Sequence, residues 1–181
     1  NAELPQLQRA GARVVVSIWG RSIEDYAEAA EALAVLVGRH DQPGAIVALE
    51  VNLSCPNLAG KSMFAHDAPA AAQVMAATAV AGLPRWAKLS PNTDRLVQVA
   101  TACAEAGADA VTLTNTLLGL VIDIETRRPV LGGGGGGVSG PGMGPIAVRA
   151  VWDVARALPQ LPIIGAGGVC DADSAIQLLM A

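Results

Sequence analysis

The sequence predicts an α/β fold in which parallel strands alternate with helices. Five short apolar runs have the continuous hydrophobic character of strands that are covered on both faces, at residues 14–18, 45–51, 86–89, 110–113 and 161–165. Segments with helical periodicity separate these runs, and a strand–helix–strand order implies parallel neighbours joined by right-handed crossovers. A chain of 181 residues has the length of one domain, so we expect residues 1–181 to form a single unit.

A polar residue or a glycine lies at the carboxyl end of every predicted strand, namely Ser17, Asn52, Lys88, Asn115 and Gly167. A barrel gathers all its strand ends around one mouth, whereas a doubly wound sheet uses mainly its switch point. We therefore predict a (β/α)8 TIM barrel that is incomplete, because about five βα units are visible where a barrel has eight. The chain begins with Asn1 and stops within a helical pattern, so we expect it to be truncated at both ends.

Capping signals define where two of the helices begin and end. Ser22, with acidic residues in the turn after it, is typical of a helix start, and we expect this helix to run to Gly38. The pair Thr93 and Asp94 is expected to cap another helix, which ends at Gly107.

Composition excludes several classes of function. The net charge is −4 and no basic run is present, so we expect no nucleic-acid partner. No uninterrupted apolar stretch is long enough to span a membrane. Three widely separated cysteines and two histidines without a Cys-x-x-Cys pair predict no protein-bound metal, and they fit a reducing, cytoplasmic location.

The segment 50–57, Glu-Val-Asn-Leu-Ser-Cys-Pro-Asn, places the thiol of Cys55 between two amides at a strand end. A free cysteine is most often a small buried hydrophobe. However, Asn52 and Asn57 gain nothing at an apolar strand end unless something forms hydrogen bonds with them. We therefore interpret Cys55 as an active-site thiol that exchanges a proton.

Two glycine-rich segments follow the fourth and fifth strands. The run 132–137 continues to Gly140, and a helix is predicted to begin near 144–146; a flexible linker is the alternative interpretation. Gly167 and Gly168 precede another predicted helix start. Glycine beside a helix start lets backbone amides approach a phosphate, and barrels commonly hold a phosphate group at two such neighbouring loops. The pair predicts a phosphorylated cofactor.

These motifs resemble those of the dihydroorotate dehydrogenases. Class 1 members carry an Asn-x-Ser-Cys-Pro-Asn segment whose cysteine is the catalytic base, whereas the membrane-associated class 2 enzymes have serine at that place. The resemblance continues, in the family's order, at 87–92 (Ala-Lys-Leu-Ser-Pro-Asn), 112–116 (Thr-Leu-Thr-Asn-Thr), 138–141 (Val-Ser-Gly-Pro) and 162–169 (Pro-Ile-Ile-Gly-Ala-Gly-Gly-Val).

The resemblance implies that FMN binds at the barrel mouth and that dihydroorotate is oxidised to orotate, a step of pyrimidine biosynthesis. Cys55 would remove the proton from C5 of the substrate, and FMN would accept the hydride from C6. Expected substrate contacts are Asn52, Asn57, Asn115 and Thr116, whose amides and hydroxyl suit a pyrimidine ring. Expected cofactor contacts are Ser17, Asn52, Lys88, Gly140, Gly167, Gly168 and, through its backbone, Thr114.

Lys88 has a specific role in this interpretation. Its ammonium can stabilise the negative charge that builds on a reduced flavin. The alternative is a surface lysine whose stem covers apolar area while its charge stays in water.

Residues 119–129 resemble the NAD-coupled branch of class 1, through Gly119, Ile122, Asp123, Thr126 and Pro129. Members of that branch pair with a second subunit that holds FAD and an iron–sulfur cluster, so such a partner is possible here, and we also expect an oligomer. The sequence does not decide among three electron acceptors: NAD through a partner, fumarate and a quinone. One departure from the branch is Ser17, which stands where the branch has asparagine.

Two alternatives remain at this level. Another pyrimidine-reducing flavin barrel, similar to dihydropyrimidine dehydrogenase, would have histidine in place of Asn57. A non-catalytic barrel that binds a phosphate ligand would not need a thiol, a lysine and amides at one mouth.

Overall fold

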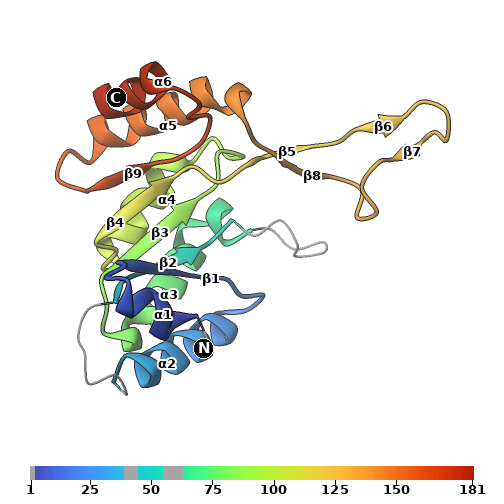
Figure 1. The fold of residues 1–181 in the computed structure, drawn as a ribbon. Helices are drawn as coiled ribbons and strands as arrows, with labels where there is room; N and C mark the ends of the chain where they lie inside the picture. Colours follow the sequence, from blue (N-terminus) through green and yellow to red (C-terminus); the bar gives the residue numbers. More distant parts are fainter. Residues whose placement is uncertain (1–2, 39–44, 55–62) are drawn as a thin grey trace.

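The computed structural model of the chain describes residues 3–38, 45–54 and 63–181. Its central sheet is built from β1 (Val14–Ile18), β2 (Ile46–Asn52), β3 (Arg85–Leu89), β4 (Ala110–Leu113) and β9 (Ile163–Gly165). All neighbouring pairs are parallel, and the order of strands in the sheet is their order in the chain. A doubly wound sheet reverses its order at a switch point, whereas a barrel wall does not. The predicted five units of an incomplete barrel are confirmed (Figure 1).

The helices of the structure are α1 (Leu4–Arg9), α2 (Ile23–Gly38), α3 (Ala68–Ala77), α4 (Leu96–Glu105), α5 (Gly144–Ala157) and α6 (Ala172–Met180), with short 3-10 turns η1 (Phe64–His66), η2 (Thr78–Ala81) and η3 (Pro141–Met143). From α2 to α6, each helix contacts the next one along the chain. This succession of contacts is the one expected of helices that surround a barrel wall. Within the described residues, every helix is too short or too polar to cross a lipid bilayer.

The caps of two helices differ in how well the sequence predicted them. Ser22 begins α2 as expected, since its Oγ accepts a hydrogen bond from the backbone N–H of Asp25. The prediction that Thr93 and Asp94 cap α4 was wrong. Arg95 is the N-cap residue and makes no capping bond with its side chain. Thr93 instead accepts a hydrogen bond from the N–H of Arg95, which forms a turn before the helix begins.

Side chains alternate between the two faces of the sheet, and the register of the strands gives the two faces different chemistry. One face packs against the helices through fully buried apolar residues, including Leu49, Val51, Ala87, Leu89, Val111 and Leu113. The opposite face carries Ser17, Glu50, Asn52, Lys88 and Thr112. The polar face is the one that a closed barrel turns inward.

A long arm leaves the sheet between β4 and α5 (Figure 1). It is a two-stranded ribbon in which β5 (Leu117–Gly119) pairs with β8 (Gly136–Val138), and β6 (Ile122–Asp123) pairs with β7 (Arg128–Pro129). The glycine run 132–137 therefore belongs to the returning side of the arm, and only the segment from Gly140 onward adjoins α5.

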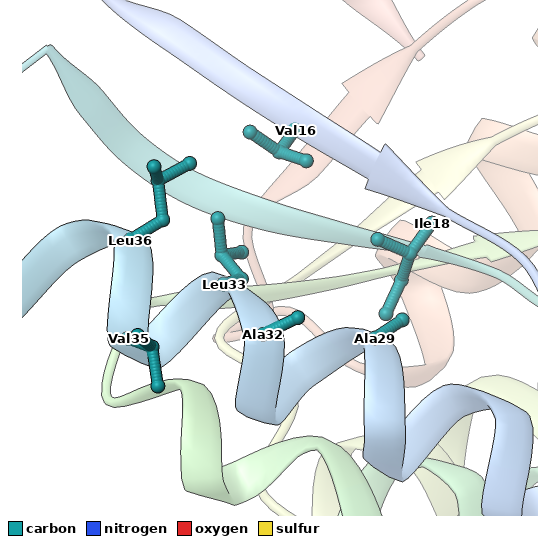
Figure 2. Close-up of a pocket in the computed structure, with 7 residues that line it drawn as sticks. All are labelled: Val16, Ile18, Ala29, Ala32, Leu33, Val35 and Leu36. Carbon is teal, nitrogen blue, oxygen red and sulfur yellow. The ribbon is translucent and has the colours of Figure 1, made fainter. Parts of the chain in front are cut away.

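An apolar gap of about 310 Å³ lies between β1 and α2. Figure 2 shows the side chains that line it, which are Val16, Ile18, Ala29, Ala32, Leu33, Val35 and Leu36. No side chain in this set can form a hydrogen bond or carry a charge, so the gap is not a candidate for the chemistry predicted above.

Candidate active site

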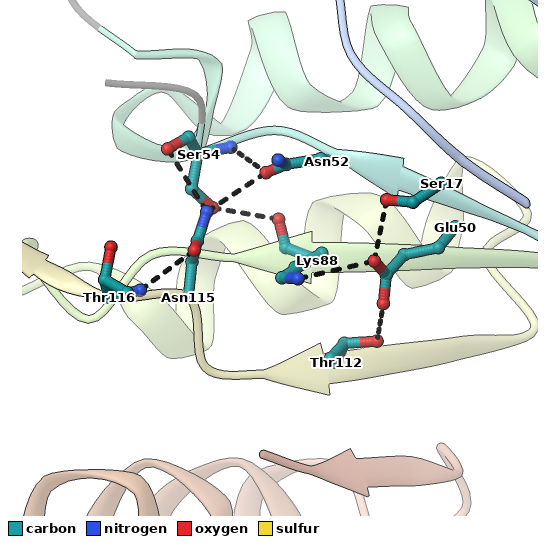
Figure 3. A network of polar contacts seen from close by, with 8 residues as sticks. All are labelled: Ser17, Glu50, Asn52, Ser54, Lys88, Thr112, Asn115 and Thr116. Atoms are coloured by element: carbon teal, nitrogen blue, oxygen red, sulfur yellow. Dashed lines mark hydrogen bonds and ion pairs between the residues drawn. The ribbon is translucent and has the colours of Figure 1, made fainter. Parts of the chain in front are cut away.

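Three of the predicted substrate contacts come together at the ends of β2 and β4. The Nδ2 group of Asn115 donates to Oδ1 of Asn52 at 3.2 Å and to the carbonyl oxygen of Ser54 at 3.3 Å. Oδ1 of Asn115 accepts from the N–H of Thr116 at 2.9 Å (Figure 3). Both amide oxygens are thus used within the protein. A ligand here would meet the Nδ2 group of Asn52 and the hydroxyl of Thr116.

A second network lies beside the first on the same face and centres on Glu50. Oε1 of Glu50 accepts from Oγ of Ser17 at 2.8 Å, and Oε2 accepts from Oγ1 of Thr112 at 2.9 Å. The ammonium of Lys88 is 3.5 Å from Oε1 (Figure 3). Sequence reasoning found Ser17 and Lys88 but missed Glu50. The available signal was a single carboxylate in an otherwise apolar strand, which is rare unless the charge is paired.

The end of β2 is anchored from two sides. The hydroxyl of Tyr26 donates to the carbonyl oxygen of Asn52 at 2.6 Å, and Oγ of Ser54 donates to the carbonyl oxygen of Lys88 at 3.0 Å. The predicted base, Cys55, and the predicted contact Asn57 lie outside the described residues. Their roles stay predictions, although the residues that lead into them are held in place.

Thr114 presents a buried hydroxyl at the end of β4. Its backbone N–H donates to the carbonyl oxygen of Ala166 at 2.7 Å, so this group is already used within the protein. Its Oγ1 is buried and has no hydrogen-bond partner among the described residues. A buried hydroxyl without a partner costs free energy, and a polar ligand at the strand ends would remove that cost.

The two predicted phosphate loops lie against each other. Gly167 and Gly168 have φ values of 119° and 78°, which favour glycine, and Gly140 has a φ of 89°. A Cβ atom on Gly168 would overlap the backbone nitrogen and Cα of Gly144, the first residue of α5. This close approach brings the loop after β9 to the start of a helix, where unpaired N–H groups favour an anion.

A cavity of about 200 Å³ lies at this contact. Its walls include Pro141, Gly144, Gly167, Gly168 and Ser174. The glycine loops therefore form part of the wall of a space between α5 and α6, whose lining also includes Val148, Gln177 and Leu178.

The other two cysteines lie in contrasting surroundings. Cys103 is fully buried in the helix layer, and burial raises the pKa of its thiol to about 12. Cys170 lies in the exposed loop after β9, with its Sγ atom 3.7 Å from the carboxylate of Asp171. Among the described residues, no cluster of three side chains has the composition of a metal site.

Sequence reasoning also missed Asn92, which forms hydrogen bonds with the start of the arm. Nδ2 of Asn92 donates to the carbonyl oxygen of Thr116 at 2.9 Å, and its Oδ1 accepts from the N–H of Leu118 at 2.8 Å. Asn92 thus ties the loop after β3 to the place where the arm leaves β4. Its partners are more than 20 residues away in the chain, so its side-chain type alone did not reveal this role.

Comparison with known proteins identifies relatives along the whole chain. The family model described as Dihydroorotate dehydrogenase matches residues 2–181. The catalytic subunit of dihydroorotate dehydrogenase B (NAD(+)) from Pelobacter propionicus is 44% identical over 181 residues, which are 99% of this chain and 57% of that protein. The subunit of the same name from Desulforudis audaxviator is 47% identical over 180 residues, 98% of this chain and 56% of that protein.

The chain thus spans a little more than half the length of these relatives. Among solved structures, the ligand-free dihydroorotate dehydrogenase of Eimeria tenella matches with a TM-score of 0.64 at 19% identity. This match covers 86% of the present chain and 47% of that one. At this level of identity the match speaks for the fold, and it agrees with the barrel wall described above.

Proposed function

The chain belongs to the dihydroorotate dehydrogenase family, and from that membership we propose that it is the catalytic part of an enzyme that oxidises dihydroorotate to orotate in pyrimidine biosynthesis. One observation carries the proposal beyond the family name. The amide pair of Asn52 and Asn115, the ammonium of Lys88 and the glycine loop at Gly168 all lie at the carboxyl ends of the parallel strands, and Gly140 precedes the start of α5 that this loop contacts. Active sites of barrel enzymes are built at this end.

FMN is the cofactor that we propose, and the residues present fit it. The contact between Gly168 and Gly144 and the cavity beside it suit the phosphate. The unpaired hydroxyl of Thr114, together with Lys88, suits the polar edge of the ring. Further contacts are proposed for Ser17, Asn52, Gly140 and Gly167. When bound, the flavin supplies a two-electron acceptor for hydride.

The chain's own residues then hold the substrate and remove its proton. Asn52, Asn57, Asn115 and Thr116 are proposed to bind the carbonyl and N–H groups of the dihydropyrimidine ring. Cys55 is proposed to take the proton from C5 as the hydride leaves C6, which forms the double bond of orotate. A free thiol has a pKa near 8.5, so it serves as a base close to neutral pH with little activation.

We further propose a partner subunit with FAD and an iron–sulfur cluster. The relatives from Pelobacter and Desulforudis are each named as the catalytic subunit of an NAD(+) enzyme, and a catalytic subunit implies another subunit. The resemblance of residues 119–129 to the NAD-coupled branch supports the same assignment. An oligomeric assembly and a cytoplasmic location complete the proposal.

The test is anaerobic reduction of the flavin by dihydroorotate in the intact enzyme. We expect Cys55→Ala to retain FMN and to lose most of the flavin reduction at neutral pH, because the C5 proton then has no acceptor. Cys103→Ala is the matched control, since this thiol is buried in the helix layer and should not affect the reaction.

Two results would contradict the proposal in different ways. An unchanged reduction rate in Cys55→Ala would refute the role of the thiol as the base. Faster reduction by a dihydropyrimidine without the carboxylate of dihydroorotate would instead identify another pyrimidine-reducing flavin barrel.

A further inference from the structure

Glu50 occupies an unusual place for a carboxylate. It lies in β2, the second of the five strands of the sheet, between Leu49 and Val51, which are fully buried. Its side chain is only 14% exposed and points to the inner face of the barrel wall. A charge in such a place costs free energy unless it is paired and hydrogen-bonded.

The surroundings of Glu50 satisfy both of its oxygens. Ser17 from β1 and Thr112 from β4 each donate a hydroxyl, and Lys88 from β3 brings the compensating charge. Four adjacent strands thus contribute one polar group each (Figure 3). A partly buried ion pair of this kind rarely stabilises a fold more than apolar side chains of the same size would. Stability alone does not account for it.

The consequence for Lys88 is both geometric and electrostatic. A lysine side chain has a flexible stem of four carbons, so its ammonium is poorly fixed unless a partner holds it. Glu50 supplies that partner at 3.5 Å, while the Lys88 side chain keeps 27% of its surface exposed on the inner face. The carboxylate also offsets part of the positive charge that Lys88 can direct at a reduced flavin.

We propose that Glu50 is a positioning residue that holds the Lys88 ammonium and moderates its charge, and that this pair sets the reduction potential of the bound flavin. The inference rests on the proposed function, because it assigns Lys88 to the flavin. The carboxylate limits how strongly the ammonium stabilises the reduced, anionic flavin. Without it, the reduced form becomes more stable.

The experiment measures the equilibrium between oxidised and reduced flavin in the intact enzyme against a reference dye of known potential. We expect Glu50→Gln, which removes the charge and keeps an acceptor oxygen for one of the two hydroxyls, to favour reduced flavin by about tenfold, equivalent to about +30 mV for a two-electron couple. Glu105→Gln is the matched control, because it removes the same charge from an exposed position at the end of α4.

A second background tests whether Glu50 acts through Lys88. In a Lys88→Gln enzyme, adding Glu50→Gln should change the equilibrium by less than about threefold, because the group that Glu50 positions is gone. An equal shift in both backgrounds would overturn the positioning role, and so would a shift below about threefold in the enzyme that retains Lys88.

Two further readouts keep the outcomes separate. If Glu50→Gln does not retain flavin, Thr112→Val carries the test, since it keeps both charges and removes one hydrogen bond to Glu50. A shift in Thr112→Val that disappears in the Lys88→Gln background supports the inference, and an unchanged equilibrium overturns it. A wild-type enzyme whose flavin is not reduced by dihydroorotate would refute the proposed function, whereas normal reduction with no effect of Glu50→Gln would refute only this inference.

Discussion

Tyr26 donates a hydrogen bond from its hydroxyl to the carbonyl oxygen of Asn52, with 2.6 Å between the two oxygens. The bond joins the first turn of α2 to the last residue of β2. Tyr26 is fully buried, and its ring meets the ring of Phe64 edge to face at a centroid distance of 5.6 Å. One aromatic side chain therefore fixes the strand end from which the segment with Cys55 continues.

We expect Tyr26→Phe to lower the free energy of unfolding by about 1–2 kcal/mol, because the carbonyl oxygen of Asn52 loses a buried donor while the ring contact stays. The rate of flavin reduction by dihydroorotate should fall as well, since the strand end is less well fixed. Urea unfolding and stopped-flow absorbance measure the two effects. Phe64→Leu is the control that removes the ring contact and keeps the hydrogen bond. Equal stability of Tyr26→Phe and wild type would contradict the assignment.

The contact between Gly168 and Gly144 leads to a second prediction. An alanine at Gly168 would need a φ near 78° and would place its Cβ against the backbone of Gly144. We expect Gly168→Ala to lower the free energy of unfolding by about 3 kcal/mol, through strain and overpacking together. FMN binding should also be weaker, because the two loops must separate. Gly142→Ala is the matched control, because its Cβ would meet no atom within 4 Å. Tight FMN binding by Gly168→Ala would argue against a phosphate site at this contact.

Because the thiol of Cys103 is buried, we expect the stability of the protein to fall at alkaline pH. Burial raises its pKa from 9.0 to about 12, so the thiol stays protonated in the folded state while the unfolded chain loses the proton. The unfolded state then binds fewer protons, and stability falls as pH rises above the unfolded value. We expect about 2 kcal/mol to be lost between pH 9 and 10.5, which Cys103→Ala should abolish. Parallel pH profiles for the two proteins would rule out this thiol as the cause.

For Asp171 we expect the opposite pH dependence, namely a contribution to stability that is lost at acid pH. Hydrogen bonds from the side chain and then the backbone of Ser174 lower the pKa of this carboxyl, which caps α6. Its contribution to stability is therefore present above the unfolded pKa and is lost as pH falls through the folded one. Thermal melts should show Asp171→Ala less stable than wild type at pH 7, with the difference shrinking below pH 4, near the ordinary carboxyl pKa of about 3.9. Asp173→Ala is the control for loss of a carboxylate from the same turn without loss of the cap.

The sheet was predictable because each of its strands is a short apolar run with a distinct end. Residues 14–18 and 110–113 were predicted without error, and the boundaries of the other strands moved by one or two residues. The arm was not predicted. Its strands are two or three residues long and include glycines, so they carry no alternating pattern that a sequence window can detect.

The residues of the candidate site also divide into those that the sequence could predict and those that it could not. Asn52, Asn115 and Lys88 were found because each is polar at the end of an apolar strand. Glu50 was missed because its hydrogen-bond partners, Ser17 and Thr112, are 33 and 62 residues away, and only the register of the sheet brings them together.

The arm between β4 and α5 carries a consequence for what the fold can tolerate. With the arm, the connection from β4 to β9 is about two and a half times as long as that from β3 to β4. Each doubling of a loop raises the free-energy cost of closing it by only about 0.6 kcal/mol. An insertion at this point is therefore thermodynamically cheap, whereas the same length placed within a strand would destroy the sheet.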